Sequence, residues 1–187
     1  MTLAYIRANW PAPKNVHALT TMRAGGCSKA PFKSLNLGDH VGDDPIAVAA
    51  NRRKLNDTLR CPHPPYWLTQ THSTHVVCAK PIQDDIPPEA DASISNDAGV
   101  VCAILTADCL PIVLCDRQGQ HIAAIHAGWR GLCDGIIEAT VAQYGGCSAD
   151  SMAWIGPCLT APVAEFGGEV RDQFIAAFAP SRDAFRP

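Results

Sequence analysis

The sequence has no run of lysine or arginine, no uninterrupted long apolar stretch and no internal repeat. Its formal net charge of −3 lacks the basic excess of a generic nucleic-acid-binding protein, so we expect no nucleic-acid partner. The most apolar stretch, residues 99–115, contains Thr106, Asp108 and Pro111 and is too polar to span a bilayer. Residues 1–7 lack the charged-then-apolar order of a signal peptide, so we expect a cytoplasmic protein without a membrane partner.

Cysteine is plentiful, but the sequence lacks the spacing of a zinc ribbon or a redox pair. None of the nine cysteines belongs to a Cys-x-x-Cys pair. Their number is odd and no export signal is evident, which argues against a disulfide scaffold. Most lie within apolar runs, as Cys102 and Cys115 do, where buried thiols pack as small hydrophobic groups. We therefore expect all nine thiols to be free or bound to metal.

Apolar runs separated by turn residues predict strands and helices within a single domain over residues 1–187. Strands are predicted at residues 16–22, 66–69, 76–79, 100–105, 112–115, 122–125 and 152–155. Helices are predicted at residues 45–59, with Asp44 as N-cap, and at 131–144 and 169–178. The turn at residues 116–120 makes a hairpin of its flanking strands. The pattern predicts an α/β or α+β fold with a mixed β-sheet core and flanking helices.

Three reactive side chains stand at the ends of these apolar runs. His72 lies between two short strands, Cys109 follows the run 100–105, and His126 ends the run 122–125. Because strand ends present side chains to a cleft, two imidazoles and one thiolate here are a candidate zinc site with an open fourth position. Such ligand atoms would lie about 3–4 Å apart. The spacing equally allows a Cys–His nucleophile pair, or three side chains that are merely packed and hydrogen-bonded.

Glycine and arginine follow His126 at the start of a predicted helix. Residues 128–131 read Gly-Trp-Arg-Gly, and backbone N–H groups at a helix start, with Arg130 beside them, make a candidate phosphate site. The Gly-x-x-x-x-Gly-Lys pattern of a P-loop is absent. Arg23 is a second candidate anion contact. Plain turn chemistry and a solvated side chain are the alternatives for these two arginines.

These segments together resemble the laccase-domain family, whose members are also described as multicopper polyphenol oxidoreductases, peptidoglycan editing factors and purine nucleoside phosphorylases. The resemblance covers about residues 15 to 175, and the sequence Ala-Asp-Cys-Leu-Pro with His-Ala-Gly-Trp-Arg-Gly is its most specific part. The matching segments are Thr20-Thr21-Met22-Arg23-Ala24-Gly25-Gly26-Cys27-Ser28, Ser34-Leu35-Asn36-Leu37-Gly38, Gln70-Thr71-His72, Ala90-Asp91-Ala92, Thr106-Ala107-Asp108-Cys109-Leu110-Pro111, His126-Ala127-Gly128-Trp129-Arg130-Gly131 and Ile155-Gly156-Pro157.

The resemblance implies a fold, a site and an activity. The fold is the laccase-domain fold, which is similar to that of cysteine hydrolases. His72, Cys109 and His126 are the implied metal ligands and catalytic core, with zinc as the metal and copper as an alternative. The implied activity is phosphorolysis of inosine, adenosine, guanosine and methylthioadenosine, with adenosine deamination as a side activity.

Purine nucleoside and phosphate are the substrates that the resemblance implies. Arg130 or Arg23 is expected to bind phosphate, and Asp108 and Asn36 are expected to be weaker polar contacts to substrate. Family members continue for several tens of residues beyond the position of Pro187. We therefore expect apolar surface near the predicted last helix, around Phe174, Ile175 and Phe178, and self-association that covers it.

Three alternatives to a phosphorylase follow from the same residues. Two histidines and a cysteine resemble a blue-copper ligand set, but a multicopper oxidase also needs a trinuclear cluster rich in His-x-His pairs. The chain has seven histidines and no His-x-His. A cysteine hydrolase acting on a peptidoglycan precursor is the second alternative, and an inactive fragment is the third.

Overall fold

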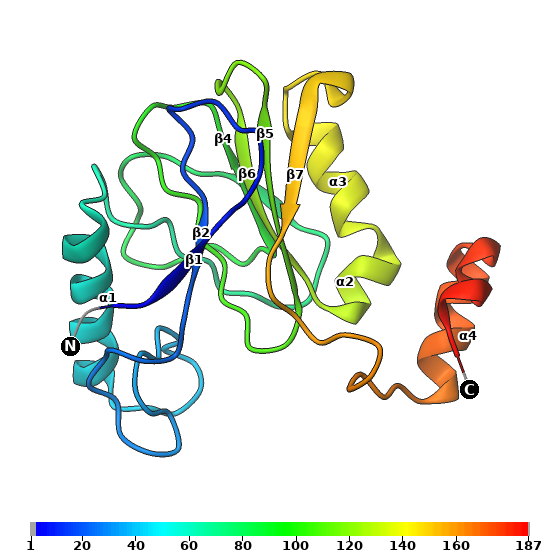
Figure 1. The fold of residues 1–187 in the computed structure, drawn as a ribbon, viewed down its shortest axis with the longest axis horizontal. Coiled ribbons are helices and arrows are strands. Elements are labelled where there is room, and N and C mark those ends of the chain that lie inside the picture. Colours follow the sequence, from blue (N-terminus) through cyan, green and yellow to red (C-terminus); the bar gives the residue numbers. More distant parts are fainter. Residues whose placement is uncertain (1–2, 187) are drawn as a thin grey trace.

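A five-stranded mixed sheet forms the centre of the molecule in the computed structural model, which describes residues 3–186 (Figure 1). Met1, Thr2 and Pro187, which the sequence analysis includes in the single domain, lie outside the described residues. The strands in spatial order are β3 (Val76–Cys78), β4 (Ala92–Ser95), β6 (Ile122–Ala127), β5 (Leu110–Asp116) and β7 (Ser151–Ile155). Only β3 and β4 run parallel, and the other neighbours are antiparallel. The predicted mixed sheet with helices is therefore confirmed.

The hairpin of β5 and β6 is the feature that positions the candidate site. Pro111 pairs with His126 and Leu110 with Ala127, so the start of β5 and the end of β6 lie at the same end of the sheet. The turn between the strands contains Gly119 with a φ of 68°, a left-handed conformation that glycine adopts at no steric cost. The predicted hairpin is confirmed, and its register brings the residue before β5 next to the last residues of β6.

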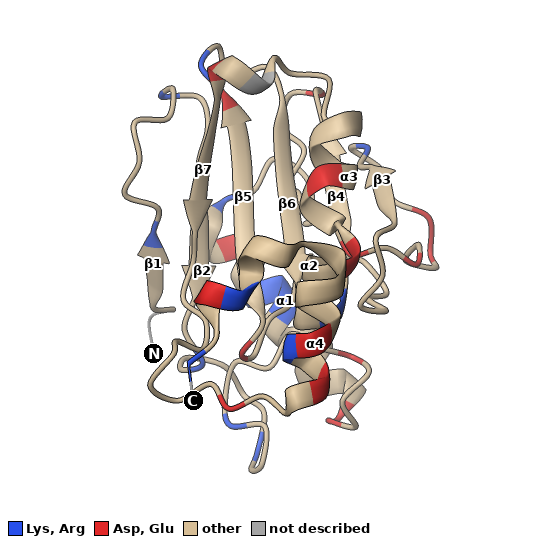
Figure 2. Ribbon diagram, turned by 90° about the vertical axis from the view of Figure 1, so that its right-hand side faces the viewer, with Lys and Arg blue, Asp and Glu red and all other residues tan. Residues whose placement is uncertain are grey.

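Helices α2 (Trp129–Asp134) and α3 (Ile136–Gln143) cover one face of the sheet, in front of the strands in Figure 2. The sequence predicts one helix over residues 131–144, which is wrong. Gly135, with a φ of 94°, ends α2 in the left-handed conformation and caps the start of α3. The break lets Ile136 and Thr140 of α3 turn toward the sheet, where both are fully buried.

The main core lies between α3 and the central strands. Its buried residues are Ala92, Ile112, Leu114, Ala123, Ile125, Ala127, Ile136 and Tyr144. Small residues on β4 and β6 let the helix approach closely, while the larger ones fill the gaps between them. The polar end of the buried Tyr144 is satisfied, since its hydroxyl donates to the carbonyl of His121 at 2.9 Å.

A second, smaller cluster packs under the N-terminal part of the chain. Helix α1 (Pro45–Leu59) has the predicted bounds, and the Asp44 side chain caps it by accepting from the N–H of Ile46 at 2.9 Å. Strands β1 (Tyr5–Arg7) and β2 (Leu19–Thr21) form a separate two-stranded sheet, so the predicted strand 16–22 is shorter than expected. The cluster consists of Leu3, Leu35, Leu37 and Leu55, with Tyr5, Leu59, Trp67 and Leu105 against it.

The apolar run 100–105 is not a strand, contrary to prediction. It makes one isolated bridge, between Cys102 and Tyr66, and residues 66–69 likewise form only bridges instead of the predicted strand. The place beside β6 belongs to β4, which the sequence analysis missed because its small residues lack an apolar run. Leu105 packs against the second cluster instead, and burial raises the pKa of the Cys102 thiol to about 11.

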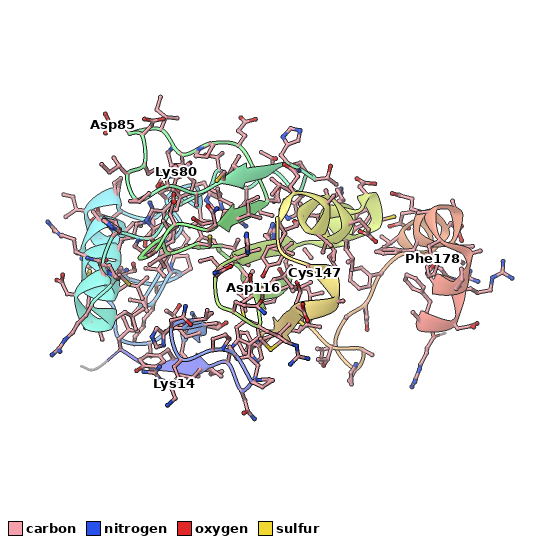
Figure 3. All side chains as sticks on the ribbon, turned by 90° about the horizontal axis from the view of Figure 1, so that it is seen from above. Lys14, Lys80, Asp85, Asp116, Cys147 and Phe178 are labelled. Carbon is pink, nitrogen blue, oxygen red and sulfur yellow. The ribbon has the colours of Figure 1, made fainter. Side chains whose placement is uncertain are left out.

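The C-terminal part of the chain consists of α4 (Gly168–Ala177), close to the predicted helix, and the 3-10 helix η2 (Ala179–Ala184). A further 3-10 turn, η1 (Ser148–Asp150), precedes β7. The expected apolar surface here is present in part. Phe178 is 64% exposed, at one end of the molecule in Figure 3, whereas Phe174 and Ile175 are half-buried. The Phe174 ring also packs against that of Phe185.

All nine cysteines are unpaired thiols, as predicted. Charged residues of both signs are interspersed along the elements visible in Figure 2. Among residues 3–186, no helix combines the length and the apolar character needed to cross a membrane.

Candidate metal centre

His126 is a buried histidine near the end of β6, and only 3% of it is exposed. Its Nδ1 lies 2.8 Å from Oδ1 of Asp91, a fully buried carboxylate just before β4. Burial alone raises the pKa of Asp91, but hydrogen bonds from His126, Ser73 and Thr71 outweigh it and hold that pKa well below its usual range. An ionised carboxylate can only accept, so Nδ1 of His126 donates and Nε2 keeps its lone pair.

Cys109 immediately precedes β5 and is half-buried. The sequence predicts a strand at residues 100–105 ahead of it, which is wrong, because that strand does not form. The register of the hairpin nevertheless brings Cys109 close to His126. Leu110 pairs with Ala127, so the preceding residue, Cys109, lies beside the chain that follows β6. Burial, followed by the charge of Asp108 and a hydrogen bond to it, raises the pKa of the Cys109 thiol.

His72 lies in a loop between residues 69 and 76 and has a φ of 59°, an uncommon left-handed conformation for a residue that is not glycine. The backbone N–H groups of Thr71, His72 and Ser73 all donate to the Asp91 carboxylate, at 3.2, 3.0 and 2.6 Å. The Gln70 amide also anchors this loop to the backbone of Leu105. The surrounding hydrogen bonds thus hold the unusual backbone of His72.

The three side chains converge on one point at the end of the sheet. One ligand atom from each of His72, Cys109 and His126 lies within 4.8 Å of the other two. Nε2 of His72 is 4.0 Å from Sγ of Cys109, and the two imidazole rings are 4.8 Å apart in an edge-to-face arrangement. Within residues 3–186, no other group of three or more histidine, cysteine or acidic side chains is arranged in this way.

The residues fit a zinc ion. Two imidazole nitrogens and one sulfur are the donor set of an open catalytic zinc site, and these atoms need to move by only about 1 Å to reach tetrahedral spacing. Gly128 keeps the space clear, because a Cβ at this position would lie 2.6 Å from Cδ2 of His72 and 3.3 Å from Sγ of Cys109. The Asp91–His126 contact is also the carboxylate–imidazole arrangement that accompanies metal-binding histidines.

The other predicted contacts lie at different places. Arg130 is exposed, and its guanidinium stacks on the Trp129 ring at 4.3 Å, whereas Nε and Nη2 of Arg23 both donate to the Lys33 carbonyl. Asp108 is exposed beside Cys109.

The side-chain amide of Asn36 makes its hydrogen bonds within its own loop. It bonds to the backbone of Gly38 and to Oδ2 of Asp43. Asn36 and Arg23 thus shape their loops, whereas the guanidinium of Arg130 stacks on the Trp129 ring.

Asp91 is the site residue that the sequence analysis did not single out. The segment Ala90-Asp91-Ala92 was noted only as part of the resemblance. A signal was present, since this acidic residue lies between two alanines, and alanine is often buried in cores. All three residues are fully buried. A buried carboxylate requires hydrogen-bond donors, and here they come from residues 71–73 and from His126.

Comparison with known proteins identifies the family of this chain. The family model described as multi-copper polyphenol oxidoreductase laccase matches residues 17–187. A purine nucleoside phosphorylase of Pseudomonas aeruginosa is 51% identical over 184 residues, which cover 98% of this chain and 74% of that protein. A purine nucleoside phosphorylase of Haemophilus influenzae is 44% identical over 182 residues, covering 97% of this chain and 74% of that protein.

Solved structures show the same fold. The crystal structure of a Neisseria meningitidis protein matches with a TM-score of 0.92 and 42% identity, over 98% of this chain and 74% of that chain. YlmD from Geobacillus stearothermophilus matches with a TM-score of 0.83 and 29% identity, over 90% of this chain and 67% of that chain. Because the family model matches most of the chain, the chain belongs to the multi-copper polyphenol oxidoreductase laccase family.

Proposed function

We propose that this protein is a purine nucleoside phosphorylase whose active site is the cluster of His72, Cys109 and His126. The observation that carries the proposal is the convergence of these three side chains within 4.8 Å. Relatives up to 51% identical, which bear the name purine nucleoside phosphorylase, support the same activity. The substrates are inosine, adenosine, guanosine and methylthioadenosine, with phosphate as the second substrate, and the enzyme acts in the cytoplasm.

In the reaction, a phosphate oxygen forms a bond to the anomeric carbon of ribose as the bond to the purine nitrogen breaks. From inosine the products are ribose 1-phosphate and hypoxanthine, whose purine nitrogen takes up the proton that hydrogen phosphate gives up. The transition state resembles an oxocarbenium ion, so catalysis requires phosphate held on one face and stabilisation of the departing base.

Arg130 is the residue that binds phosphate. Stacking on Trp129 fixes the plane of its guanidinium, and no described side chain forms an ion pair with it. Arg23 donates to Lys33 and is the weaker candidate. Asp108, exposed beside Cys109, is placed to contact the nucleoside, whereas the Asn36 amide acts on its own loop.

His72 and His126 would hold the metal through Nε2, and Cys109 would hold it through Sγ. Zinc suits this donor set, and copper is the alternative metal. When bound, a zinc ion supplies an activated water, the chemistry that a deaminase side activity on adenosine requires. Asp91 keeps the proton of His126 on Nδ1, and the burial of His126 excludes water from that side.

The alternatives receive less support from the same observations. A trinuclear copper cluster needs many more imidazoles than the two found here, and the described residues contain no second cluster. A cysteine hydrolase would use Cys109 with His72 as its base, whose Nε2 lies 4.0 Å from the sulfur, but the relatives named purine nucleoside phosphorylase favour phosphorolysis over hydrolysis. Self-association through the exposed Phe178 remains a proposal that does not involve this site.

The test is incubation of the purified protein with inosine, with and without phosphate, followed by quantification of hypoxanthine and ribose 1-phosphate. We expect both products in equal amounts, and only when phosphate is present. Parallel reactions after treatment with a chelator show whether the metal takes part. Hypoxanthine release that needs no phosphate, or oxidation of a polyphenol without phosphorolysis, would contradict the proposal.

A further inference from the structure

We propose that Asp91 is a positioning residue, one carboxylate that fixes the geometry of both His72 and His126. The inference rests on the proposed function only in taking the His72–Cys109–His126 cluster as the active site. Asp91 lies on the far side of His126 from that cluster, because it bonds to Nδ1 while Nε2 remains for a ligand. It therefore acts through the histidines and not on the substrate.

The two carboxylate oxygens of Asp91 accept hydrogen bonds from two segments, residues 71–73 around His72 and His126 itself. Oδ1 accepts from Nδ1 of His126 at 2.8 Å and from the backbone N–H of His72 at 3.0 Å. Oδ2 accepts from the N–H and hydroxyl of Ser73 at 2.6 and 2.8 Å, and from the N–H and hydroxyl of Thr71 at 3.2 and 3.4 Å. Six donors from two separate segments thus converge on one fully buried side chain.

For His72, the carboxylate compensates an unfavourable backbone. The left-handed conformation at a φ of 59° is unfavourable for a residue that is not glycine. Three consecutive N–H groups around His72 point at Asp91 in this conformation, so the charge-assisted hydrogen bonds hold it. Without these bonds the loop would lose the conformation that points the imidazole at Cys109.

For His126, the carboxylate selects the tautomer. A neutral imidazole carries its proton on one nitrogen only, and Asp91 requires that nitrogen to be Nδ1. Nε2 then faces the cluster with its lone pair available. The opposite tautomer would place an N–H where the metal or substrate must bind.

Asparagine cannot replace Asp91 in this arrangement. Both carboxylate oxygens accept backbone N–H groups, so the NH₂ of an amide must face a donor in either orientation. If the NH₂ occupies the Oδ1 position, it donates to Nδ1 of His126 and forces the proton onto Nε2. If it occupies the Oδ2 position, it opposes the N–H of Ser73 and loosens the His72 loop.

The chain offers a matched control at the other end of the same hairpin. Nδ1 of His121 lies 2.7 Å from Oδ2 of Asp116, which is also buried and also accepts a backbone N–H, from Gln120 at 2.8 Å. Burial alone raises the pKa of Asp116, and these hydrogen bonds outweigh it, as at Asp91. This pair lies about 20 Å from the cluster, since six residues of strand separate the two ends. Asp116→Asn therefore breaks an equivalent pair without touching the site.

The experiment compares wild type, Asp91→Asn and Asp116→Asn by ¹⁵N NMR of the histidine side chains without metal, and by competition titration with zinc. We expect His126 of the wild type to be protonated on Nδ1. Asp91→Asn should lower zinc affinity roughly 10–100-fold, and should lower kcat for inosine with little change in KM. Asp116→Asn should keep the zinc affinity of the wild type, although both variants lose stability.

The tautomer and zinc measurements need no nucleoside, so they remain informative even if phosphorolysis is absent. Protonation of wild-type His126 on Nε2 would overturn the proposal, as would wild-type zinc affinity in a folded Asp91→Asn. If Asp91→Asn does not fold, Ser73→Ala removes a single donor to Oδ2. We then expect a smaller loss of zinc affinity without a change of the His126 tautomer, and wild-type affinity would contradict the role of Asp91 at the His72 loop.

Discussion

Phosphate-dependent release of hypoxanthine is expected to fall by about 1,000-fold or more when Cys109 is replaced by alanine. The substitution removes the only sulfur ligand of the cluster and leaves two imidazoles, a set that holds zinc weakly. A loss of this size corresponds to about 4 kcal/mol of transition-state stabilisation, which is reasonable for the removal of a ligand or a reacting group at the proposed active site. Bound zinc, measured by elemental analysis, should fall from one per chain to near zero.

Cys61→Ala is the matched control for this experiment. Cys61 is also half-buried, and burial likewise raises the pKa of its thiol, but it lies in the connector after α1. Its replacement should leave zinc content and hypoxanthine release unchanged. Phosphorolysis at the wild-type rate by Cys109→Ala would show that the thiol is neither a ligand nor a reacting group.

A single methyl group is expected to close the site. Gly128→Ala would put its Cβ 2.6 Å from Cδ2 of His72, closer than unbonded carbon atoms approach, so the imidazole must move. The backbone itself is not the cause, because Gly128 has a φ of −61°, which any residue adopts. Displacing a ligand by about 1 Å costs on the order of 100-fold, and we expect zinc affinity and phosphorolysis to fall together by that factor.

Gly168→Ala provides the comparison, since a Cβ at Gly168 meets nothing within 4 Å. Circular dichroism should show both variants folded, and only Gly128→Ala should lose zinc. If Gly128→Ala binds zinc as tightly as Gly168→Ala does, then the space beside His72 and Cys109 is not the metal position.

Local sequence patterns predicted the part of the site that a hairpin creates. The apolar runs around residues 116–120 gave the β5–β6 pairing, and this pairing alone brings Cys109 close to His126. The role of His72 could not be derived in this way, because its loop reaches the site through contacts to Asp91, nineteen residues further along the chain. Its position between two predicted short strands grouped His72 with the other two residues, and the resemblance to a family supported that grouping.

The errors have one physical origin, which is that hydrophobicity does not specify which neighbour a segment packs against. The run 100–105 is more apolar than β4, yet β4 occupies the place beside β6 because its small side chains fit under α3. The break at Gly135 was missed because a glycine within an apolar pattern is compatible with either one helix or two. Asp91 was overlooked for a related reason: its donors come from elements that are distant in sequence.

The most direct test of the metal centre is anomalous scattering at the zinc edge from crystals of this protein grown with zinc. We expect one strong peak at the end of the sheet, at about 2.0–2.3 Å from Nε2 of His72, Nε2 of His126 and Sγ of Cys109. Its fourth position should be open to water or substrate. A zinc peak elsewhere, or none in crystals of protein that phosphorolyses inosine at full rate, would contradict the assignment of these three residues.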